Sequence, residues 1–245
     1  IFWYNNFIHK NMYKNLSLLL PAKNELLCID KVFKELEKIN FNSQVLLVVD
    51  SIQDNTLKFK KKKYSFKIIK IITNKKGYGA AVIEGIKKCK TTKVCIFNAD
   101  GSFNPLSLKK MVSLSKKYDH IFCSRYLNNA GSDDDTFLTF IGNKIFTLTG
   151  KVFFNMKLED ILYAYYLSDV KKIKKLKLQQ QDFSIALEVP LKIENFDQTY
   201  CEIPSKERKR ISGIKKVREF VDGFKLLKYM IFFFFKYVFL KKFFN

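Results

Sequence analysis

The sequence predicts an α/β protein in which a mainly parallel β-sheet carries helices on both faces. Three observations support this fold class. Short apolar runs alternate with amphipathic helical patterns, the chain of 245 residues is long enough for one large domain, and hydrophobic residues make up 47% of it. Alternation of strand and helix is typical of parallel sheets, because parallel neighbours need a crossover connection that is usually a helix.

Five apolar runs in the first half of the chain are predicted as buried strands, because they are short and rich in Leu, Ile and Val. These runs are Leu16–Leu20, Val45–Val49, Ile68–Ile72, Val94–Phe97 and His120–Cys123. Between them, apolar residues spaced three and four apart predict helices over residues 26–36 and from residue 108 onward. Pro105 stands where the first turn of the second helix would begin.

The second half of the chain is less regular. Residues 137–154 are apolar and helix-like, and residues 199–203 are predicted as a late strand that ends before Pro204. Asp133–Asp135 lie in a polar stretch that we predict to be a mobile loop. We therefore divide the chain into an α/β domain, residues 14–215, and a C-terminal helical tail, residues 216–245.

The tail combines an apolar stripe with lysines. The stripe is formed by Val217, Phe220, Val221, Phe224, Leu227 and Ile231. Lysines at 228, 236, 241 and 242 interrupt the apolar run, whereas a bilayer span needs about 20 mostly apolar residues. We predict an amphipathic helix that lies at a membrane surface. A buried core helix and a truncated membrane span are the alternatives.

The net charge indicates what kind of partner the protein binds, and the cysteine and histidine content indicates the state of its thiols and the absence of a zinc site. The formal net charge of +22 favours an anionic partner, which includes nucleic acid, an anionic membrane surface and phosphorylated substrates. The chain has no pattern of an RNA-recognition, helix-turn-helix or zinc-finger module, so we expect no nucleic acid. Five cysteines without a CxxC pair suggest reduced thiols, and two histidines make a His-based zinc site improbable.

Each predicted strand is followed by polar or glycine residues. They are Pro21, Ala22, Lys23, Asn24 and Glu25 after the first strand, Asp50 and Asp54 after the second, Gly77 and Gly79 after the third, Asn98 and Asp100 after the fourth, and Ser124 and Arg125 after the fifth. Open α/β sheets bind ligands at the carboxyl ends of their strands. The sequence therefore predicts one ligand site at this edge of the sheet.

These segments, in this order, resemble the family 2 glycosyltransferases. The resemblance is carried by "LSLLLPAKNE", "VVDSIQDNT", "NKKGYGAAVIEGI", "FNADGSFNP", "SRY", "GNKIFTLTG", "DILYAYYL" and "EIPSKERKRISGIKK". It extends over about residues 16–230, and the sequence is most similar to the polyprenyl-phosphate sugar transferases of the dolichyl-phosphate mannose or glucose synthase type. The resemblance implies a GT-A fold, which is Rossmann-like, a nucleotide-sugar donor, a divalent metal and a membrane-bound acceptor.

The resemblance assigns a donor site. Its residues are Pro21, Ala22, Asn24, Glu25, Asp50, Asp54, Gly77, Gly79 and Asn98. Glu25 would bind the nucleoside and Asp50 the base or ribose. Two positions depart from the family pattern, because Lys23 replaces an aromatic residue and Ser51 replaces a second acidic residue. The glycines would let backbone N–H groups approach the phosphates, although glycines also serve close strand–helix packing.

A metal site is expected at "NAD". Expulsion of a nucleotide diphosphate requires neutralisation of its charge, and Mg²⁺ or Mn²⁺ supplies this. The family places an Asp-x-Asp motif where this chain has Asn98 and Asp100. The resemblance implies that Asp100 is the direct ligand, with Asn98 as a weaker neutral ligand or a contact to ribose. The alternative is a plain turn that ends the strand.

The acceptor side is assigned to basic residues. A polyprenyl phosphate is already ionised, so it needs cationic positioning rather than a general base. Arg125, Arg210 and Lys215 are the predicted contacts to its phosphate, and Arg210 and Lys215 fall in the family's Arg-x-x-Gly-x-Ser-Lys segment. Asp160 falls at an acidic position of the family and would be a base if the acceptor were a hydroxyl. The predicted catalytic set is Asp100, Arg125 and Asp160.

The predicted function is inverting transfer of a hexose from a nucleotide-diphosphate sugar to a polyprenyl phosphate or other lipid-linked acceptor, at the cytoplasmic face of the membrane. Three alternatives remain at this point. A degenerate homologue that binds without turnover is suggested by Asn98 and Ser51. A nucleic-acid-binding protein is suggested by the charge alone, and a nucleotidyltransferase would share the α/β fold.

Overall fold

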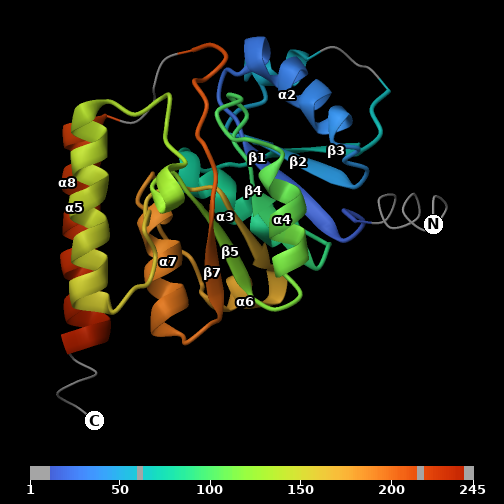
Figure 1. The fold of residues 1–245 in the computed structure, drawn as a ribbon. Helices are drawn as coiled ribbons and strands as arrows, with labels where there is room; N and C mark the ends of the chain where they lie inside the picture. The colour runs from blue at the N-terminus through green and yellow to red at the C-terminus, as the bar shows by residue number, and fades with distance from the viewer. Residues whose placement is uncertain (1–11, 60–62, 214–217, 240–245) are drawn as a thin grey trace.

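The computed structural model describes residues 12–59, 63–213 and 218–239, and its centre is a seven-stranded sheet (Figure 1). The strand order is β3-β2-β1-β4-β6-β5-β7. The strands are β1 (Leu16–Pro21), β2 (Gln44–Val49), β3 (Lys67–Ile72), β4 (Lys93–Ile96), β5 (His120–Ser124), β6 (Tyr166–Asp169) and β7 (Tyr200–Pro204). β6 is antiparallel to both of its neighbours, β4 and β5, and the other pairings are parallel. The mainly parallel sheet and the predicted strands are confirmed.

The helices surround this sheet. They are α2 (Leu26–Lys38), α3 (Tyr78–Lys88), α4 (Ser107–Leu114), α5 (Phe137–Phe154), α6 (Val170–Lys175), α7 (Ile185–Asn195) and α8 (Glu219–Phe233). Short turns η1 (Asn55–Lys58) and η2 (Leu127–Asn129) lie in loops, and a π-helical segment η3 (Phe234–Phe239) extends α8. The prediction of α5 agrees with the structure at both ends, where Thr136 caps the first turn through its side chain and Asn155 ends the helix in a left-handed conformation.

Side chains of the strands alternate between two hydrophobic cores, one on each face of the sheet. In β1, Leu18 and Leu20 pack in the core that contains α2 and α4, whereas Leu19 packs in the core that contains α3 and α7. In β4, Val94 and Cys95 divide in the same way. Successive side chains of a strand point to opposite faces of the sheet, so a strand whose residues are all buried must be covered on both faces. The predicted helices on both faces are confirmed.

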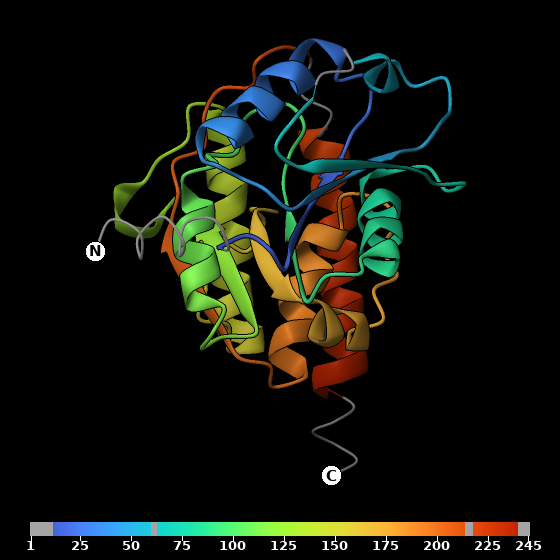
Figure 2. The same ribbon diagram turned by 90° about the vertical axis from the view of Figure 1, so that its right-hand side faces the viewer.

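Helices α5 and α8 lie side by side at one flank of the molecule (Figures 1 and 2). Their first turns are joined by Glu219, whose carboxylate accepts hydrogen bonds from the hydroxyls of Thr136 and Thr139 at 2.9 and 2.7 Å. Near their ends, the rings of Phe154 and Phe233 have centroids 5.9 Å apart. The two helices therefore run parallel and form one unit.

The tail helix is partly buried, and the face that is buried is not the predicted stripe. Leu226, Tyr229, Met230 and Phe233 pack in the core shared with α5 and α7, whereas the stripe residues Phe220, Val221, Phe224, Leu227 and Ile231 are exposed. Val217 lies outside the described residues. Within the described part of the chain, no helix is long and apolar enough to cross a membrane.

All five cysteines are unpaired thiols, as the sequence suggests. Four of them are buried, and Cys201 is partly exposed. In Cys95 and Cys123, burial in the core raises the pKa of the thiol, so these groups stay protonated and behave as small apolar side chains.

Candidate active site

A cavity of about 1280 Å³ opens at the carboxyl ends of the central strands and continues between α5 and α8. Its wall brings together most of the predicted site residues, namely Pro21, Ala22, Asn24, Glu25, Asp50, Gly77, Asn98, Asp100, Arg125 and Arg210. These residues are far apart in the sequence and meet because parallel strands end at one edge. The other end of the cavity is lined by α5 and α8, mostly through apolar residues such as Ile145, Phe146, Phe224 and Leu227, with Asn143, Thr149 and Asp222 among them.

The loop after β1 is held by Asp54, which does not line the cavity. The Asp54 carboxylate accepts hydrogen bonds from the backbone N–H of Asn24 at 3.1 Å and from that of Thr56 at 2.8 Å. Asn24 itself has a left-handed backbone with φ of 57°, which asparagine tolerates. Asp54, predicted to bind the donor, therefore positions the Asn24–Glu25 loop instead of facing the cavity.

Asp50 faces the cavity beside a residue that departs from the family pattern. The ammonium of Lys23 lies 3.5 Å from the Asp50 carboxylate. Lys23 is largely exposed, so the pair is screened by solvent and contributes little to stability. The ion pair nevertheless places a positive charge where the family has an aromatic ring, at the predicted base or ribose contact.

Gly77 and Gly79 lie against another backbone segment rather than in an open cradle. A Cβ on Gly77 would lie 2.4 Å from the carbonyl oxygen of Gln181, and a Cβ on Gly79 would lie 2.2 Å from that of Gln180. Gly77 lines the cavity, whereas Gly79 does not. Close packing, the alternative weighed for these glycines, explains Gly79.

The segment that meets these glycines is fixed by a buried carboxylate. Glu188 on α7 accepts hydrogen bonds from the backbone N–H groups of Gln179 and Gln180 at 2.8–3.0 Å, and Lys192 neutralises it at 2.7 Å. Asp182 and Phe183, which follow directly, line the cavity. Glu188 therefore positions one wall of the site without facing it.

Asn98 and Asp100 lie on the cavity wall directly after β4, as predicted. One carboxylate oxygen of Asp100 accepts hydrogen bonds from the backbone N–H and the hydroxyl of Ser102, at 3.0 and 2.7 Å. The side-chain oxygen of Asn98 accepts a long hydrogen bond of 3.5 Å from the hydroxyl of Tyr78. In the part of the chain that the structure describes, no cluster of three or more His, Cys, Asp or Glu side chains could hold a metal alone. This donor set fits a divalent ion shared with substrate phosphates, because Mg²⁺ is commonly bound by one or two carboxylates and phosphate oxygens.

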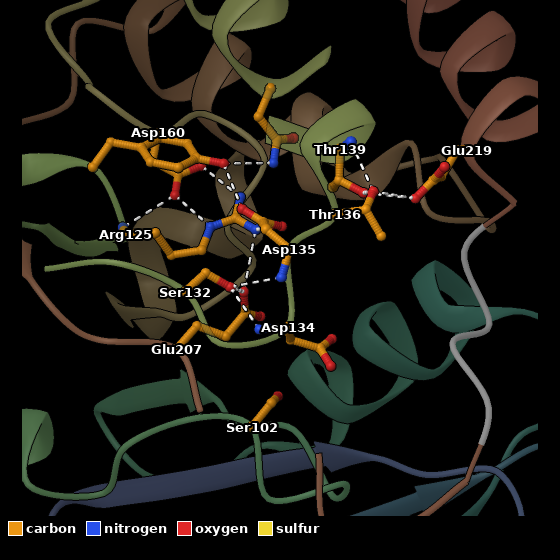
Figure 3. A network of polar contacts seen from close by, with 12 residues as sticks. Ser102, Arg125, Ser132, Asp134, Asp135, Thr136, Thr139, Asp160, Glu207 and Glu219 are labelled. Atoms are coloured by element: carbon orange, nitrogen blue, oxygen red, sulfur yellow. Dashed lines mark hydrogen bonds and ion pairs between the residues drawn. The ribbon is translucent and has the colours of Figure 1, made fainter. Parts of the chain in front are cut away.

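Arg125, a predicted acceptor contact, is buried among three carboxylates (Figure 3). Its guanidinium donates to Asp160 at 2.7 and 2.9 Å, to Asp135 at 3.1 Å and to Glu207 at 3.4 Å. Burial alone would lower the pKa of Arg125, but these carboxylates raise it well above its usual range. In this conformation its charge is matched by protein groups rather than offered to a phosphate.

Asp160 does not line the cavity and is fully occupied by Arg125. Both of its carboxylate oxygens accept hydrogen bonds from the Arg125 side chain, and one also accepts from the Arg125 backbone N–H at 3.1 Å. A general base needs a carboxylate oxygen within reach of the acceptor hydroxyl. The geometry therefore makes Asp160 a positioning residue for Arg125 and does not favour the predicted role as a base.

Arg210 faces the cavity and is held by the loop that the sequence predicts to be mobile. Its guanidinium donates to Asp134 at 3.2 and 2.5 Å, and these hydrogen bonds raise the pKa of Arg210. The hydroxyl of Ser132 fixes the loop by accepting from the backbone N–H groups of Asp134 and Asp135 and by donating to Glu207 at 2.6 Å. Lys215, the third predicted phosphate contact, lies outside the described residues.

Sequence reasoning missed the carboxylates that pair with the acceptor-side arginines. Asp134 and Asp135 were predicted to lie in a loop without a role in the site. Glu207 lies in a basic stretch, of which only the cationic residues were assigned to the site. The one available signal was the run of three aspartates at 133–135, because like charges in a row are costly unless cations lie nearby.

The sheet, its helices and the polar site at the strand ends define a glycosyltransferase of the GT-A type. The model of the family "Glycosyl transferase family 2" matches residues 17–175, so the chain belongs to this family. A search of curated proteins finds no match to the chain.

Solved structures share the fold. Glucosyl-3-phosphoglycerate synthase from Mycobacterium tuberculosis in complex with phosphoglyceric acid gives a TM-score of 0.66 at 12% identity, over 91% of this chain and 82% of that chain. The same enzyme with Mg²⁺ and uridine-diphosphate gives 0.63 at 12% identity, over 94% and 82%. A structure described only as a mycobacterial protein gives 0.64 at 10% identity, over 89% and 74%. At these identities the likeness establishes the fold, and the metal in that enzyme is of the kind predicted here.

Proposed function

We propose that this protein transfers a hexose from a nucleotide-diphosphate sugar to a polyprenyl phosphate, or another lipid-linked acceptor, at the cytoplasmic face of a membrane. The observation that carries the proposal is the cavity itself. It is polar at the strand ends, where Asn98 and Asp100 lie, and between α5 and α8 it gains many apolar side chains among a smaller number of polar ones. A donor with two phosphates suits the first part, and an acceptor with an ionic head and a hydrocarbon chain suits the whole.

In this proposal the donor lies over the ends of β1, β2 and β4. Asp50 and Glu25 would bind the nucleoside, and Asp100, with Asn98 beside it, would hold Mg²⁺ or Mn²⁺. The metal supplies Lewis-acid stabilisation of the leaving diphosphate. Because the protein offers few anionic ligands, we expect the ion and the nucleotide to bind together.

The acceptor phosphate would reach the donor along Arg210. A phosphate oxygen is ionised near neutral pH, so the reaction needs no general base, which agrees with the engagement of Asp160 by Arg125. Arg210 would exchange its bidentate pair with Asp134 for the phosphate, because a guanidinium binds both groups with the same geometry. Arg125 would then act by fixing the surrounding carboxylates rather than by touching phosphate.

Two features support a membrane surface as the place of action. Exposed apolar side chains that do not line the cavity lie on both flanking helices, namely Phe137, Phe140, Leu148, Val152 and Phe153 on α5 and Ile231 and Phe232 on α8. We call these residues the α5–α8 face. Exposed lysines at 144, 228 and 236 lie on the same elements, and the net charge is +22. Apolar side chains with lysines are typical of helices that lie in the interface of an anionic bilayer.

The donor site is tested by calorimetric titration of UDP and of GDP, each with and without Mn²⁺, into the wild type and Asp100→Ala. We expect one nucleotide to bind with Mn²⁺ and the variant to lose most of that metal-dependent gain, on the order of ten-fold or more in affinity. Absence of binding of both nucleotides to the wild type would refute the donor assignment.

The acceptor class is tested separately, with the donor that the titration selects. Transfer of labelled sugar to a polyprenyl phosphate in detergent is compared with transfer to glycerol 3-phosphate. We expect label in the lipid fraction, because the apolar side chains of the cavity can contact the hydrocarbon chain of a lipid but not a short soluble acceptor. Transfer to glycerol 3-phosphate alone would refute the lipid acceptor and leave the donor site intact.

A second candidate is a homologue that binds nucleotide or lipid without turnover. Two observations favour it, since Asn98 gives the metal no charge and Lys23 pairs with Asp50 at 3.5 Å. Asn98→Asp discriminates between the candidates. A large gain in donor hydrolysis would mean that the natural site is impaired, whereas little change would favour the active enzyme.

A further inference from the structure

The loop that carries the proposed metal ligand is bound along its backbone by a distant segment. The backbone N–H of Ile211 donates to the carbonyl of Asp100 at 2.9 Å, and the backbone N–H of Arg208 donates to the carbonyl of Ser102 at 2.9 Å. The segment 208–211 thus runs beside residues 100–103, more than a hundred positions earlier in the chain.

The side chain of Arg208 completes this contact. Its Nη2 atom lies 2.8 Å from the carbonyl oxygen of Gly101 and 2.7 Å from that of Phe103. The same atom lies 2.8 Å from the carboxylate of Glu35 on α2, which holds the guanidinium from the other side. Each carbonyl oxygen of residues 100–103 therefore accepts a hydrogen bond from residue 208 or 211.

Gly101 makes this arrangement close-fitting. Its φ is +81°, a conformation that favours glycine, and a Cβ there would lie 2.3 Å from the side chain of Ile211. The Ile211 side chain therefore fills the space over the loop. Displacement of the Asp100–Phe103 turn would break the hydrogen bonds that residues 208 and 211 donate to it.

We propose that Arg208 is a positioning residue for the metal end of the donor site. By holding the carbonyls on either side of Ser102 it fixes the turn whose N–H and hydroxyl orient the Asp100 carboxylate. Arg208 does not line the cavity, so it acts through Asp100 and not on the donor. Arginine suits this task because its longer side chain brings Nη2 to these oxygens and its planar guanidinium fixes the direction of the N–H groups, whereas the ammonium of lysine lies on a shorter and more flexible stem. The inference rests on the proposed function, since it assigns a role within that donor site.

The test measures how much Mn²⁺ strengthens nucleotide binding. UDP and GDP are titrated with and without saturating Mn²⁺ into the wild type, Arg208→Lys and the control Lys209→Ala, which alters an exposed neighbour. We expect Arg208→Lys to reduce the metal-dependent gain in affinity by about ten-fold, with metal-free affinity unchanged. Lys209→Ala should match the wild type. Glu35→Gln removes the negative charge that faces Arg208 but keeps an acceptor oxygen, so it should also reduce the metal-dependent gain, by a smaller factor.

Other outcomes are distinguishable. An unchanged gain in Arg208→Lys, or a loss of binding sites with unchanged affinity, would overturn the positioning role and leave the donor site standing. An equal fall in metal-free and metal-bound affinity would also overturn it, because the effect would not pass through the metal. If Mn²⁺ did not change the nucleotide affinity of the wild type, the proposed function would be refuted, and the role of Arg208 with it.

Discussion

The guanidinium of Arg125 contacts three carboxylates, those of Asp135, Asp160 and Glu207. A buried charge is costly unless it is paired, so the energetic effect of each substitution depends on what it leaves behind. Removal of the cation leaves several buried carboxylates in mutual repulsion. Removal of one carboxylate leaves the cation with two partners.

We therefore expect Arg125→Met to lower the free energy of unfolding by about 3–5 kcal/mol and Asp160→Asn to lower it by roughly 1–3 kcal/mol. Lys206→Met is the control, because Lys206 forms an exposed pair with Asp133 and its loss should be nearly neutral. Urea unfolding of the three variants measures this order. If Asp160→Asn lowered the free energy of unfolding more than Arg125→Met, the pairing of one cation with three carboxylates would not explain the stability of this cluster.

Gly79 offers a second residue-scale prediction. In Gly79→Ala the new Cβ would lie 2.2 Å from a backbone oxygen, so α3 and the 180–182 segment must separate, at a cost of about 1–3 kcal/mol. Gly223→Ala in α8 is the matched control, since its Cβ meets nothing within 4 Å, and we expect it to stabilise by about 0.5–1 kcal/mol. Thermal unfolding compares them, and equal melting temperatures would count against the packing role.

At the scale of elements, the α5–α8 face allows a sharper test of membrane binding than removal of the tail. Truncation after Lys228 would remove Tyr229, Met230 and Phe233, which are buried, and so would disturb the core. Substitution on the exposed side avoids this problem.

We expect Leu148→Glu combined with Ile231→Glu to abolish most sedimentation with vesicles of phosphatidylglycerol and phosphatidylcholine, because each change places a charge in the bilayer interface and neither residue lines the cavity. Leu27→Glu is the control, since Leu27 is equally apolar and exposed but lies on α2. Sedimentation of the double variant at the wild-type level would show that another surface binds lipid.

The elements differ in how much of them the sequence reveals. Strands such as β2 and the helix α5 follow strong local patterns, and their predicted positions agree with the structure to within about a residue. β6 was missed because it has four residues within a run of aromatic side chains and no turn residue to mark it. α7 contains Pro190, which hides its helical pattern.

The candidate site also contains residues that the sequence predicts and residues that it does not. Asp50, Asn98 and Asp100 could be predicted because strand ends meet whatever the rest of the chain does. The partners of Arg208 and Arg210 could not, since Glu35, Gly101 and Asp134 are brought to them by loop paths that leave no periodic signal. The domain boundary near residue 215 stays a prediction.

At the scale of the whole molecule, the buried His120 and the partly buried Glu202 make stability depend on pH in opposite directions. Burial lowers the pKa of His120 to about 4, and its ring hydrogen-bonds to Ser168 and Gln198. Because the unfolded chain takes up this proton near pH 6.5 and the folded chain does not, stability falls as the pH falls from 6.5 through 4. Burial raises the pKa of Glu202 to about 7, so its contribution falls as the pH rises from 4.5 through 7.

Urea unfolding from pH 4 to 8 separates the two groups. Relative to the wild type, His120→Gln should gain up to about 3 kcal/mol on acidification, and Glu202→Gln should gain a similar amount between pH 4.5 and 7. The two differences have opposite slopes, which general destabilisation does not produce. Parallel curves for a variant and the wild type would mean that its group titrates alike in both states.

The antiparallel strand β6 lies between β4 and β5, and this order has a consequence for synthesis on the ribosome. The strands β3, β2, β1 and β4 are all encoded before residue 97, so this half of the sheet can pair while the rest is being translated. β5 and β7 cannot join it until residues 166–169 have emerged. The half of the sheet whose strands end near Asp50, Asn98 and Asp100 can therefore form first, and the half that carries Arg125 is added only after β6 has been synthesised.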